Sequence, residues 1–378
     1  MTSGVVTFRN GTLFDGTRLQ FGQAIVFREG ALAALVPDDQ VRNEGQVIDL
    51  NGDIISPGYV DLQVNGGDGV MFNDDPSVAT IRRIAGAHRK LGVVSLLPTL
   101  ITDTPEKTRA AVEAAIQAVR DGVQGVAGLH LEGPHLSVER KGAHDADLIR
   151  PMQVSDLEAL IAAAAELPCL KVTLAPEAVT KEQVRSLFEA GVLVSLGHSN
   201  ADFATCQHYA AAGARCVTHL FNAMSQLGNR EPGLVGSALA NGSLSAGLIA
   251  DSIHVHPEVI RAAWAAKTAP GQIFLVSDAM AVAGTDRTEF ELEGRRITRT
   301  DGRLTLDDGT LAGADLDLTT AIQVLVTQVG VPLQDALAAA TTYPGQLIGQ
   351  SGSQPLRYDA MIRISADLDA CDWLPALG

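Results

Sequence analysis

Four residues with side chains suited to metal-dependent hydrolysis each follow a short apolar stretch of the sequence. Glu132 stands in the segment His130-Leu-Glu-Gly-Pro-His135. Two histidines stand in Gly197-His-Ser-Asn200 and Thr218-His-Leu-Phe-Asn-Ala-Met224, and Asp278 follows a fourth stretch. Polar side chains at the carboxyl ends of parallel strands meet at one end of a barrel or one edge of a sheet. These residues are therefore candidates for a single shared site.

One carboxylate and two imidazoles are typical of a catalytic site for a divalent metal ion. Glu132, His198 and His219 make a set of three ligands, which leaves a fourth coordination position open for water. Asp278 is the candidate for the base that takes a proton as water attacks. Two simpler interpretations stay open here: strand ends are polar in any case, and an aspartate after a strand is often a helix N-cap. The joint placement at four strand ends favours catalysis.

Eight apolar runs alternate with alanine-rich stretches of helical period from residue 54 onward. This alternation predicts a parallel α/β fold, and eight runs over about 230 residues fit a (β/α)8 barrel of the TIM type. A doubly wound open sheet is the competing fold, but no GxGxxG fingerprint opens its first βα turn. The predicted strands are 54–62, 93–100, 126–131, 170–174, 192–196, 216–220, 246–249 and 273–276.

Helix signals lie between several of these runs. Thr104-Pro105 predicts an N-cap followed by a proline in the first helical turn. Residues 318–329 carry an apolar stripe of helical period. His88 lies on another helical stretch, and we expect it on the surface.

Strand-like segments separated by turn signals stand at both ends of the chain. Residues 1–53 contain short apolar segments punctuated by Asn-Gly and Asp-Gly pairs, and residues 346–378 include an alternating strand pattern. We expect the two ends to form one small β-sandwich domain beside a hydrolase barrel at 54–345. A hairpin insertion is expected near 288–310, around Asp301-Gly302.

Composition excludes several classes of protein. Of the 378 residues, 46% are hydrophobic and 19% are charged, which excludes a disordered chain. Lys and Arg total 28 and Asp and Glu total 44, so the net charge of −16 opposes binding to nucleic acid or to an anionic membrane surface. The four cysteines are scattered without a CxxC pair, and we find no secretory signal and no run long enough to span a bilayer. We therefore expect a cytoplasmic protein.

Longer motifs around the candidate residues resemble those of one known family. Besides the segments quoted above, they include Lys141-Gly-Ala-His144, Ala175-Pro-Glu177, Arg230-Glu-Pro-Gly233 and Thr310-Leu-Ala-Gly313. Together they resemble the N-acetylglucosamine-6-phosphate deacetylase family, which belongs to the amidohydrolase superfamily of metal-dependent barrels. The resemblance covers the whole chain, including both flanking segments. The motifs of the third and sixth runs are hard to find together elsewhere.

The resemblance implies a catalytic role for each candidate. Glu132, His198 and His219 would hold one divalent metal ion per chain, and zinc is the expected ion. Asp278 would act first as the general base and then as the acid that protonates the leaving amine. His144 would contact the sugar and help to polarise the acetyl carbonyl.

The resemblance also implies a substrate pocket and a dimer. Arg230 and His254 would reach the phosphate of the substrate. Members of the family are usually homodimers, with a phosphate ligand supplied across the interface. The pocket would be lined by Ala143, His144, Asn222, Ala223 and the backbone of Leu311, Ala312 and Gly313.

The end of the first run departs from the wider superfamily. Many members carry His-x-His there and bind a second metal ion, whereas this chain carries Gln63 and Asn65 at the two positions. Neutral amides are poor ligands for zinc-like ions. The two positions are therefore interpreted as vestigial, and we expect a single-metal centre.

The expected reaction is hydrolysis of the acetamide of N-acetylglucosamine 6-phosphate to glucosamine 6-phosphate and acetate, in amino-sugar catabolism and recycling. The expected partner is thus a small sugar phosphate. A deacetylase for N-acetylgalactosamine 6-phosphate or a cyclic-amide hydrolase would use the same catalytic residues and stays open as an alternative. A metal-binding barrel without catalysis is the third alternative. Asp278 argues against it, because a purely structural zinc site is normally closed by a fourth ligand.

Overall fold

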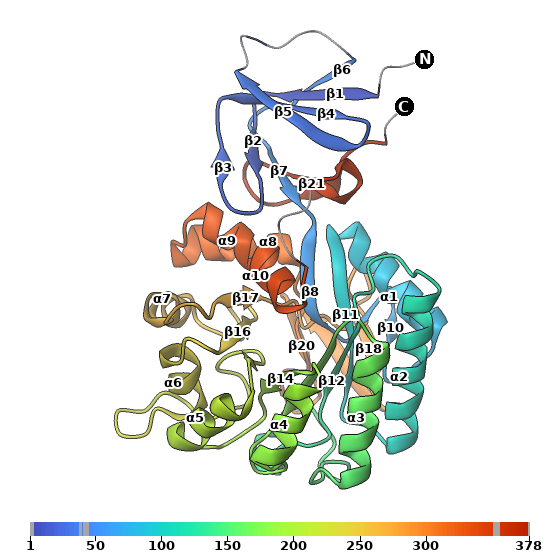
Figure 1. The fold of residues 1–378 in the computed structure, drawn as a ribbon, viewed down its shortest axis with the longest axis vertical. Helices are drawn as coiled ribbons and strands as arrows, with labels where there is room; N and C mark the ends of the chain where they lie inside the picture. Colours follow the sequence, from blue (N-terminus) through green and yellow to red (C-terminus); the bar gives the residue numbers. More distant parts are fainter. Residues whose placement is uncertain (1–3, 38–39, 41–44, 293, 351–355, 377–378) are drawn as a thin grey trace.

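An eight-stranded parallel barrel forms the body of the molecule (Figure 1). The computed structural model describes residues 4–37, 40, 45–292, 294–350 and 356–376. The barrel strands follow one another in chain order, as predicted for a (β/α)8 barrel, and the prediction of this fold is confirmed. They are β8 (Tyr59–Val64), β11 (Val93–Ile101), β12 (Leu129–Glu132), β13 (Leu170–Leu174), β14 (Leu193–Leu196), β15 (Cys216–Val217), β16 (Ser245–Leu248) and β17 (Ile273–Leu275).

The barrel closes where the chain beyond β17 returns to the end of β8. Val64 and Ala279 form a parallel bridge. The backbone N–H of Asp278 donates to the carbonyl of Gln63 at 3.1 Å, and that of Asn65 donates to the carbonyl of Ala279 at 2.9 Å. This seam brings the end of the first strand alongside Asp278.

Helices cover the outside of the barrel (Figure 1). Thr104 accepts a hydrogen bond from the backbone N–H of Lys107 at 3.3 Å and Pro105 begins α2, so the predicted cap is confirmed. Among the helices of the described residues, none combines the length and hydrophobicity that crossing a lipid bilayer requires. The helices are α1 (Val78–Lys90), α2 (Pro105–Arg120), α3 (Val154–Glu166), α4 (Lys181–Glu189), α5 (Phe203–Ala212), α6 (Gly233–Ala240), α7 (Pro257–Ala266), α8 (Leu318–Val324), α9 (Leu333–Ala340) and α10 (Thr342–Leu347), with a π-helical turn at Leu325–Val329 and 3-10 turns at Val138–Arg140 and Tyr358–Ala360.

His88 lies in the interior, and the prediction of a surface position was wrong. It is 1% exposed, and its Nε2 lies 2.9 Å from the carbonyl oxygen of Gly66. Burial lowers the pKa of His88 to about 4, so the ring is neutral and Nε2–H donates to that carbonyl. The spacing explains the burial: His88 stands four and seven residues after Ile84 and Ile81, which share the buried face of α1.

Segments near both ends of the chain build the smaller β domain at the top of Figure 1. Its two sheets have the strand orders β5-β4-β1-β6 and β22-β21-β7-β2-β3. Phe8, Phe27 and Tyr358 pack together in the core between these sheets, as expected of a β-sandwich. Its strands are β1 (Val5–Arg9), β2 (Thr12–Phe14), β3 (Leu19–Gln20), β4 (Gln23–Arg28), β5 (Ala31–Pro37), β6 (Gln46–Asp49), β7 (Ile54–Pro57), β21 (Met361–Ile364) and β22 (Cys371–Trp373).

The first predicted run, 54–62, is two strands in the structure. β7 pairs with β2 and β21 in the small domain, whereas β8 pairs with β11 in the barrel. Gly58 lies between them, where an added Cβ would stand 2.8 Å from the Cβ of Val94. A residue without a side chain is therefore needed where the chain passes from one domain to the other.

Within the segment predicted as an insertion, three antiparallel strands form a separate sheet. These are β18 (Glu289–Leu292), β19 (Arg295–Thr300) and β20 (Arg303–Thr305). Leu292, Ile297 and Leu304 are buried against Met280 near the carboxyl end of the barrel. A short ribbon of β9 (Gly66–Gly67) and β10 (Val70–Met71) follows β8 on the same side.

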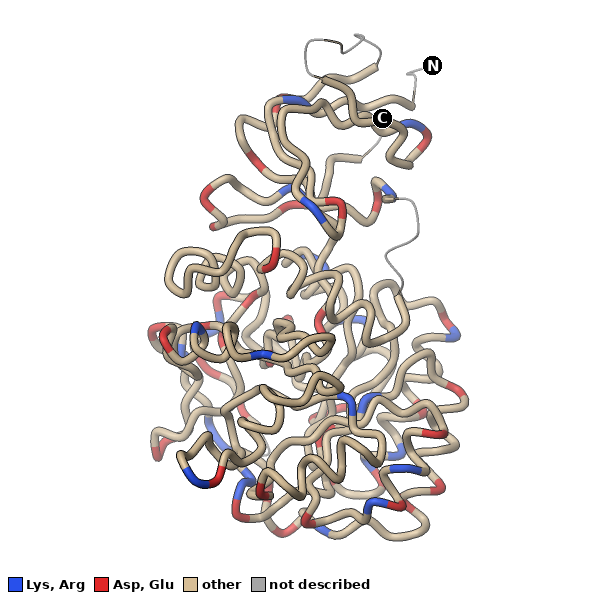
Figure 2. Tube along the Cα trace, turned by 60° about the vertical axis from the view of Figure 1, so that its left-hand side comes forward, with Lys and Arg blue, Asp and Glu red and all other residues tan. Residues whose placement is uncertain are grey.

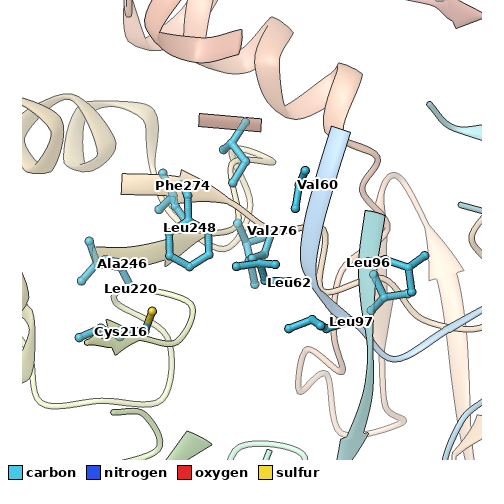
Figure 3. Close-up of a cluster of buried hydrophobic side chains, with 14 of the residues drawn as sticks. Val60, Leu62, Leu96, Leu97, Cys216, Leu220, Ala246, Leu248, Phe274 and Val276 are labelled. Carbon is cyan, nitrogen blue, oxygen red and sulfur yellow. The ribbon is translucent and has the colours of Figure 1, made fainter. Parts of the chain in front are cut away.

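Buried apolar side chains make the barrel a rigid platform. Figure 3 shows Val60 and Leu62 on β8, Leu96 on β11 and Phe274 on β17 within one cluster, and each is at most 4% exposed. Truncating such a side chain costs about 2–5 kcal/mol, so the strand ends are held firmly. On the surface, acidic and basic residues are interspersed along the helices and loops (Figure 2).

Candidate active site

Glu132, His198 and His219 meet in a buried cluster at the carboxyl-terminal end of the barrel. Glu132 ends β12, and the two histidines follow β14 and β15 within two residues. The Nε2 atoms of the two histidines lie 3.0 Å apart, and Oε1 of Glu132 lies 3.2 Å from His198 Nε2 and 3.1 Å from His219 Nε2. The ligand atoms of these three side chains lie close enough together to hold one metal ion.

The hydrogen bonds around the cluster fit a metal ion. His198 Nδ1 lies 2.9 Å from the carbonyl oxygen of Arg140, so Nδ1 carries the proton and Nε2 presents its lone pair to the cluster. Burial opposes ionisation of Glu132, but the neighbouring His198 and His219 outweigh it and lower the pKa of the carboxyl well below its usual range. An ionised carboxylate and two imidazole nitrogens are a ligand set that zinc-like ions prefer.

Asp278 lies beside the cluster and is held by two amides of the first barrel strand. Asn65 Nδ2 donates to Asp278 Oδ1 at 2.7 Å, and Gln63 Nε2 donates to the same oxygen at 3.0 Å. Gln63 Nε2 also lies 3.1 Å from Glu132 Oε1. The two positions interpreted as vestigial therefore orient Asp278 in this structure.

The surroundings of Asp278 suit a group that accepts and returns a proton. The side chain is buried, and burial together with the nearby charge of Glu132 raises the pKa of Asp278 to about 6. A carboxyl group that titrates close to neutral pH can act as a base in one step and as an acid in the next.

The ring of His144 packs against the ring of His198, with 4.4 Å between the ring centroids. The backbone N–H of Thr102 donates to His144 Nδ1 at 3.3 Å, and Thr102 Oγ1 lies 2.7 Å from the same nitrogen. Burial lowers the pKa of His144 to about 3, so the ring is neutral. Because Nδ1 accepts a hydrogen bond, Nε2 carries the proton and can donate to a carbonyl oxygen on which charge develops.

His254 lines the same cavity from the loop after β16. Its Nδ1 lies 2.6 Å from Asp251 Oδ2, and the backbone N–H groups of Ile253 and His254 donate to Asp251 Oδ1 at 2.8 Å each. Asp251 therefore fixes the ring and leaves Nε2 as the nitrogen that can meet a ligand.

A cavity of about 280 Å³ opens above the cluster and contains most of the predicted site. Ala312 is not among the residues that line it, because its side chain is buried in the apolar core under the insertion. The predicted residues that line the cavity are Asn65, Glu132, Ala143, His144, His198, His219, Asn222, Ala223, His254, Asp278, Leu311 and Gly313.

Arg230 lies on an exposed loop and is not part of this lining. The neighbouring Glu231 turns its carboxylate to backbone groups, and Oε1 accepts from the N–H of Phe203 at 2.7 Å and of Gly233 at 2.9 Å. A single chain thus does not bring Arg230 to the cavity, and its role at the phosphate stays a prediction.

The backbone at several site residues lies in the left-handed region. The φ angles are +47° at His198, +51° at Asp278 and +50° at Ala223. Residues other than glycine rarely adopt this region, because Cβ crowds the backbone, and the cost is about 1–3 kcal/mol each. This conformation turns the chain sharply at the strand ends, where these side chains reach the cavity.

Some residues of the site were not predicted from the sequence. Thr102, Arg140 and Asp251 orient three of the histidines through the hydrogen bonds described above. A usable signal existed for Ile101 and Ile249, which stand at or just after the ends of barrel strands. The other cavity residues that were missed are Gly142, Met280, Leu292 and Thr310.

A parallel barrel with a Glu/His/His cluster and a neighbouring carboxylate at its carboxyl-terminal end defines a metal-dependent hydrolase. The chain belongs to the amidohydrolase family, whose model matches residues 54–354. Membership implies a divalent metal ion, and the cluster described above can hold one.

Known relatives are deacetylases of sugar phosphates. An N-acetylgalactosamine-6-phosphate deacetylase of Shewanella sp. (strain ANA-3) is 41% identical over 299 residues, which are 79% of this chain and 75% of that protein. The N-acetylglucosamine-6-phosphate deacetylase of Homo sapiens is 35% identical over 322 residues, 81% of this chain and 77% of that protein. The crystal structure of N-acetylglucosamine-6-phosphate deacetylase from Pasteurella multocida superimposes with a TM-score of 0.88 at 33% identity and covers 96% of both chains.

Proposed function

We propose that this chain hydrolyses the acetamide of N-acetylglucosamine 6-phosphate to glucosamine 6-phosphate and acetate, as a step of amino-sugar catabolism and recycling. The observation that carries the proposal is the placement of Asp278 beside the Glu132–His198–His219 cluster in one cavity. Family membership and relatives named for this activity support it.

Glu132, His198 and His219 would hold one divalent ion, and we propose zinc because two nitrogens and a carboxylate oxygen are among its preferred ligands. A divalent ion in such a site acidifies water and polarises a carbonyl oxygen. Asp278 accepts the proton of the attacking water. His144 donates from Nε2 to the acetyl oxygen as negative charge develops there.

Asp278 then delivers the proton to the amide nitrogen. An amine is a poor leaving group unless it is protonated, so the C–N bond breaks only with this transfer. The hydrogen bonds from Asn65 and Gln63 keep the carboxylate in one place during both transfers. They give the vestigial positions a role in a single-metal centre.

We further propose a homodimer in which Arg230 serves the cavity of the other subunit. His254 lines the cavity of its own chain and is held by Asp251, so it is placed to meet the phosphate. Arg230 is exposed on the same loop as Leu227, which is 58% exposed. An arginine beside an exposed apolar side chain suits an interface, and its planar fork can bind two phosphate oxygens at once.

N-acetylgalactosamine 6-phosphate is a second candidate substrate, because a relative named for that activity is 41% identical. The two sugars differ only in configuration at C4, so the same catalytic residues serve both. Acetate release should be measured on both phosphorylated sugars and on their unphosphorylated forms. We expect the highest kcat/KM on N-acetylglucosamine 6-phosphate. A higher kcat/KM on N-acetylgalactosamine 6-phosphate would identify that sugar as the substrate instead. Release of no acetate from any of the sugars would refute the proposed function.

The proposal extends to domain division and location. Residues 1–53 and 346–378 would form the small domain and 54–345 the catalytic barrel, except that β7 (Ile54–Pro57) pairs with strands of the small domain. Residues 1–3, 38–39, 41–44, 293, 351–355 and 377–378 lie outside the described residues. The four cysteines are free, which supports the cytoplasm. The net charge of −16 supports a small-molecule partner over nucleic acid or a membrane surface.

A further inference from the structure

The insertion β18–β20 contacts two segments that line the cavity, one that follows it directly and one far away in the sequence. On one side it holds the segment that follows it: the backbone N–H of Ala312 donates to the carbonyl of Leu304 at 3.0 Å, and Thr305 bridges Leu311. Gly313 has a φ of +67°, and a Cβ there would stand 2.5 Å from Met280, so this wall is closely packed. The insertion therefore positions one wall of the cavity directly.

Arg295, the first residue of β19, reaches the other segment. Its Nη2 donates to the carbonyl oxygen of Ala143 at 2.9 Å, across 152 residues of sequence. Ala143 immediately precedes His144 and also packs against the apolar core of the insertion. The hydrogen bond from the guanidinium to this carbonyl fixes the peptide group that joins Ala143 to His144.

A residue of the barrel also holds the segment before His144. Arg140 donates to Asn200 Oδ1 from Nε at 3.0 Å and from Nη2 at 2.8 Å. Between that anchor and His144, Gly142 is exposed and has a φ of +58°. Glycine permits many backbone conformations, so a further restraint is useful in the short stretch between Arg140 and His144. Arg295 supplies one from outside the barrel.

We propose that Arg295 is a positioning residue for His144, and that the insertion acts through it to set the geometry of the cavity. The inference rests on the proposed function, because it takes His144 as the donor to the acetyl oxygen. Such a donor works only about 2.7–3.1 Å from the oxygen that becomes charged. A displacement of about 1 Å can lower the rate about a hundredfold.

Arg295→Met tests this, because methionine keeps an apolar stem and removes every donor. Arg296→Met is the matched control: it is the next residue of the strand, is exposed and pairs with Glu289. We expect Arg295→Met to lower kcat/KM at least about tenfold, mostly through kcat, with metal content and Tm close to wild type. Arg296→Met should stay within about twofold of wild type.

The variant His144→Asn shows whether Arg295 acts by positioning His144 or by stabilising the cavity as a whole. If Arg295 acts through His144, adding Arg295→Met to His144→Asn should cost less than about twofold more. An equal fold-loss with and without His144, or equal activity of the Arg295→Met and Arg296→Met variants, would overturn the inference. Should Arg295→Met fold poorly, Arg295→Lys keeps a charged donor group and should retain part of the wild-type kcat. If a folded, metal-loaded Arg295→Lys protein has the full wild-type kcat or none of it, the inference is also overturned. A wild-type protein without deacetylase activity would refute the proposed function instead.

Discussion

Replacing Asp278 by asparagine tests the proposed proton transfers at the group that performs them. Asparagine keeps the volume of the side chain and one oxygen, so the amides of Asn65 and Gln63, now 2.7 and 3.0 Å from Oδ1, still find an acceptor. Asp278 is not one of the three grouped metal ligands, so metal content should persist. What is lost is the basic carboxylate. General acid–base groups contribute about 10²- to 10⁴-fold, which is about 2.7–5.5 kcal/mol of activation free energy.

Acetate release at saturating substrate measures the effect of Asp278→Asn on kcat, and elemental analysis and Tm show whether metal and fold are kept. Asp317→Asn is the matched control, because Asp317 caps α8 and asparagine caps equally well. We expect kcat to fall at least about a hundredfold in Asp278→Asn and to stay near wild type in the control. More than about a tenth of wild-type turnover in a metal-loaded Asp278→Asn protein would refute Asp278 as the base.

The remaining predictions concern the metal ion, the dimer and stability. A chelator should abolish turnover and one equivalent of zinc should restore it, and two tightly bound ions per chain at full activity would contradict a single-metal centre. Arg230→Met should lower kcat/KM about ten- to a hundredfold on the phosphorylated sugar and hardly at all on the unphosphorylated one. Arg230→Met and Asp278→Asn subunits should also be mixed in equal amounts and allowed to exchange. Half of the random dimers are then mixed, and in each the Arg230→Met subunit keeps Asp278 and receives Arg230 from its partner, so about a quarter of all sites should be intact. No restored activity would exclude a shared site. As pH falls from 6.5 to about 4, wild type should lose up to about 3 kcal/mol more unfolding free energy than His88→Gln, because only the unfolded chain protonates His88 readily. Parallel pH curves for the two proteins would show that His88 is not the source.

The barrel could be predicted because strands buried on both faces read as continuous apolar runs. Each of the eight predicted runs overlaps a barrel strand. The same continuity hid the boundary at Gly58, since 54–62 stays apolar while the chain leaves one sheet and enters another. Burial of His88 was missed although its spacing from Ile81 and Ile84 carried the signal.

The metal cluster and Asp278 could be predicted because strand order alone brings strand ends together. Their partners could not be, since Thr102, just after β11, and Arg140, in a 3-10 turn, contact the histidines through tertiary packing that the sequence pattern does not show. The left-handed backbone at His198 and Asp278 has no signal in residue type, because those positions are not glycine. Arg230 was identified by its motif, but a motif cannot tell which copy of the chain a side chain serves.

Chemistry and substrate choice come from different parts of this molecule. The cluster and Asp278 stand at strand ends, which the buried barrel holds in place, and the acetamide at C2 of the sugar must reach them. In the proposed reaction, the phosphate at C6 would meet His254, which lines the same cavity. C4 lies between C2 and C6 along the sugar, so we expect its hydroxyl to meet the cavity walls that contain Leu292 of the insertion and Leu311, which pairs with the insertion. The strand-end residues therefore predict amide hydrolysis, whereas we expect the choice between two C4 epimers to depend on a sheet outside the barrel that the catalytic motifs do not describe.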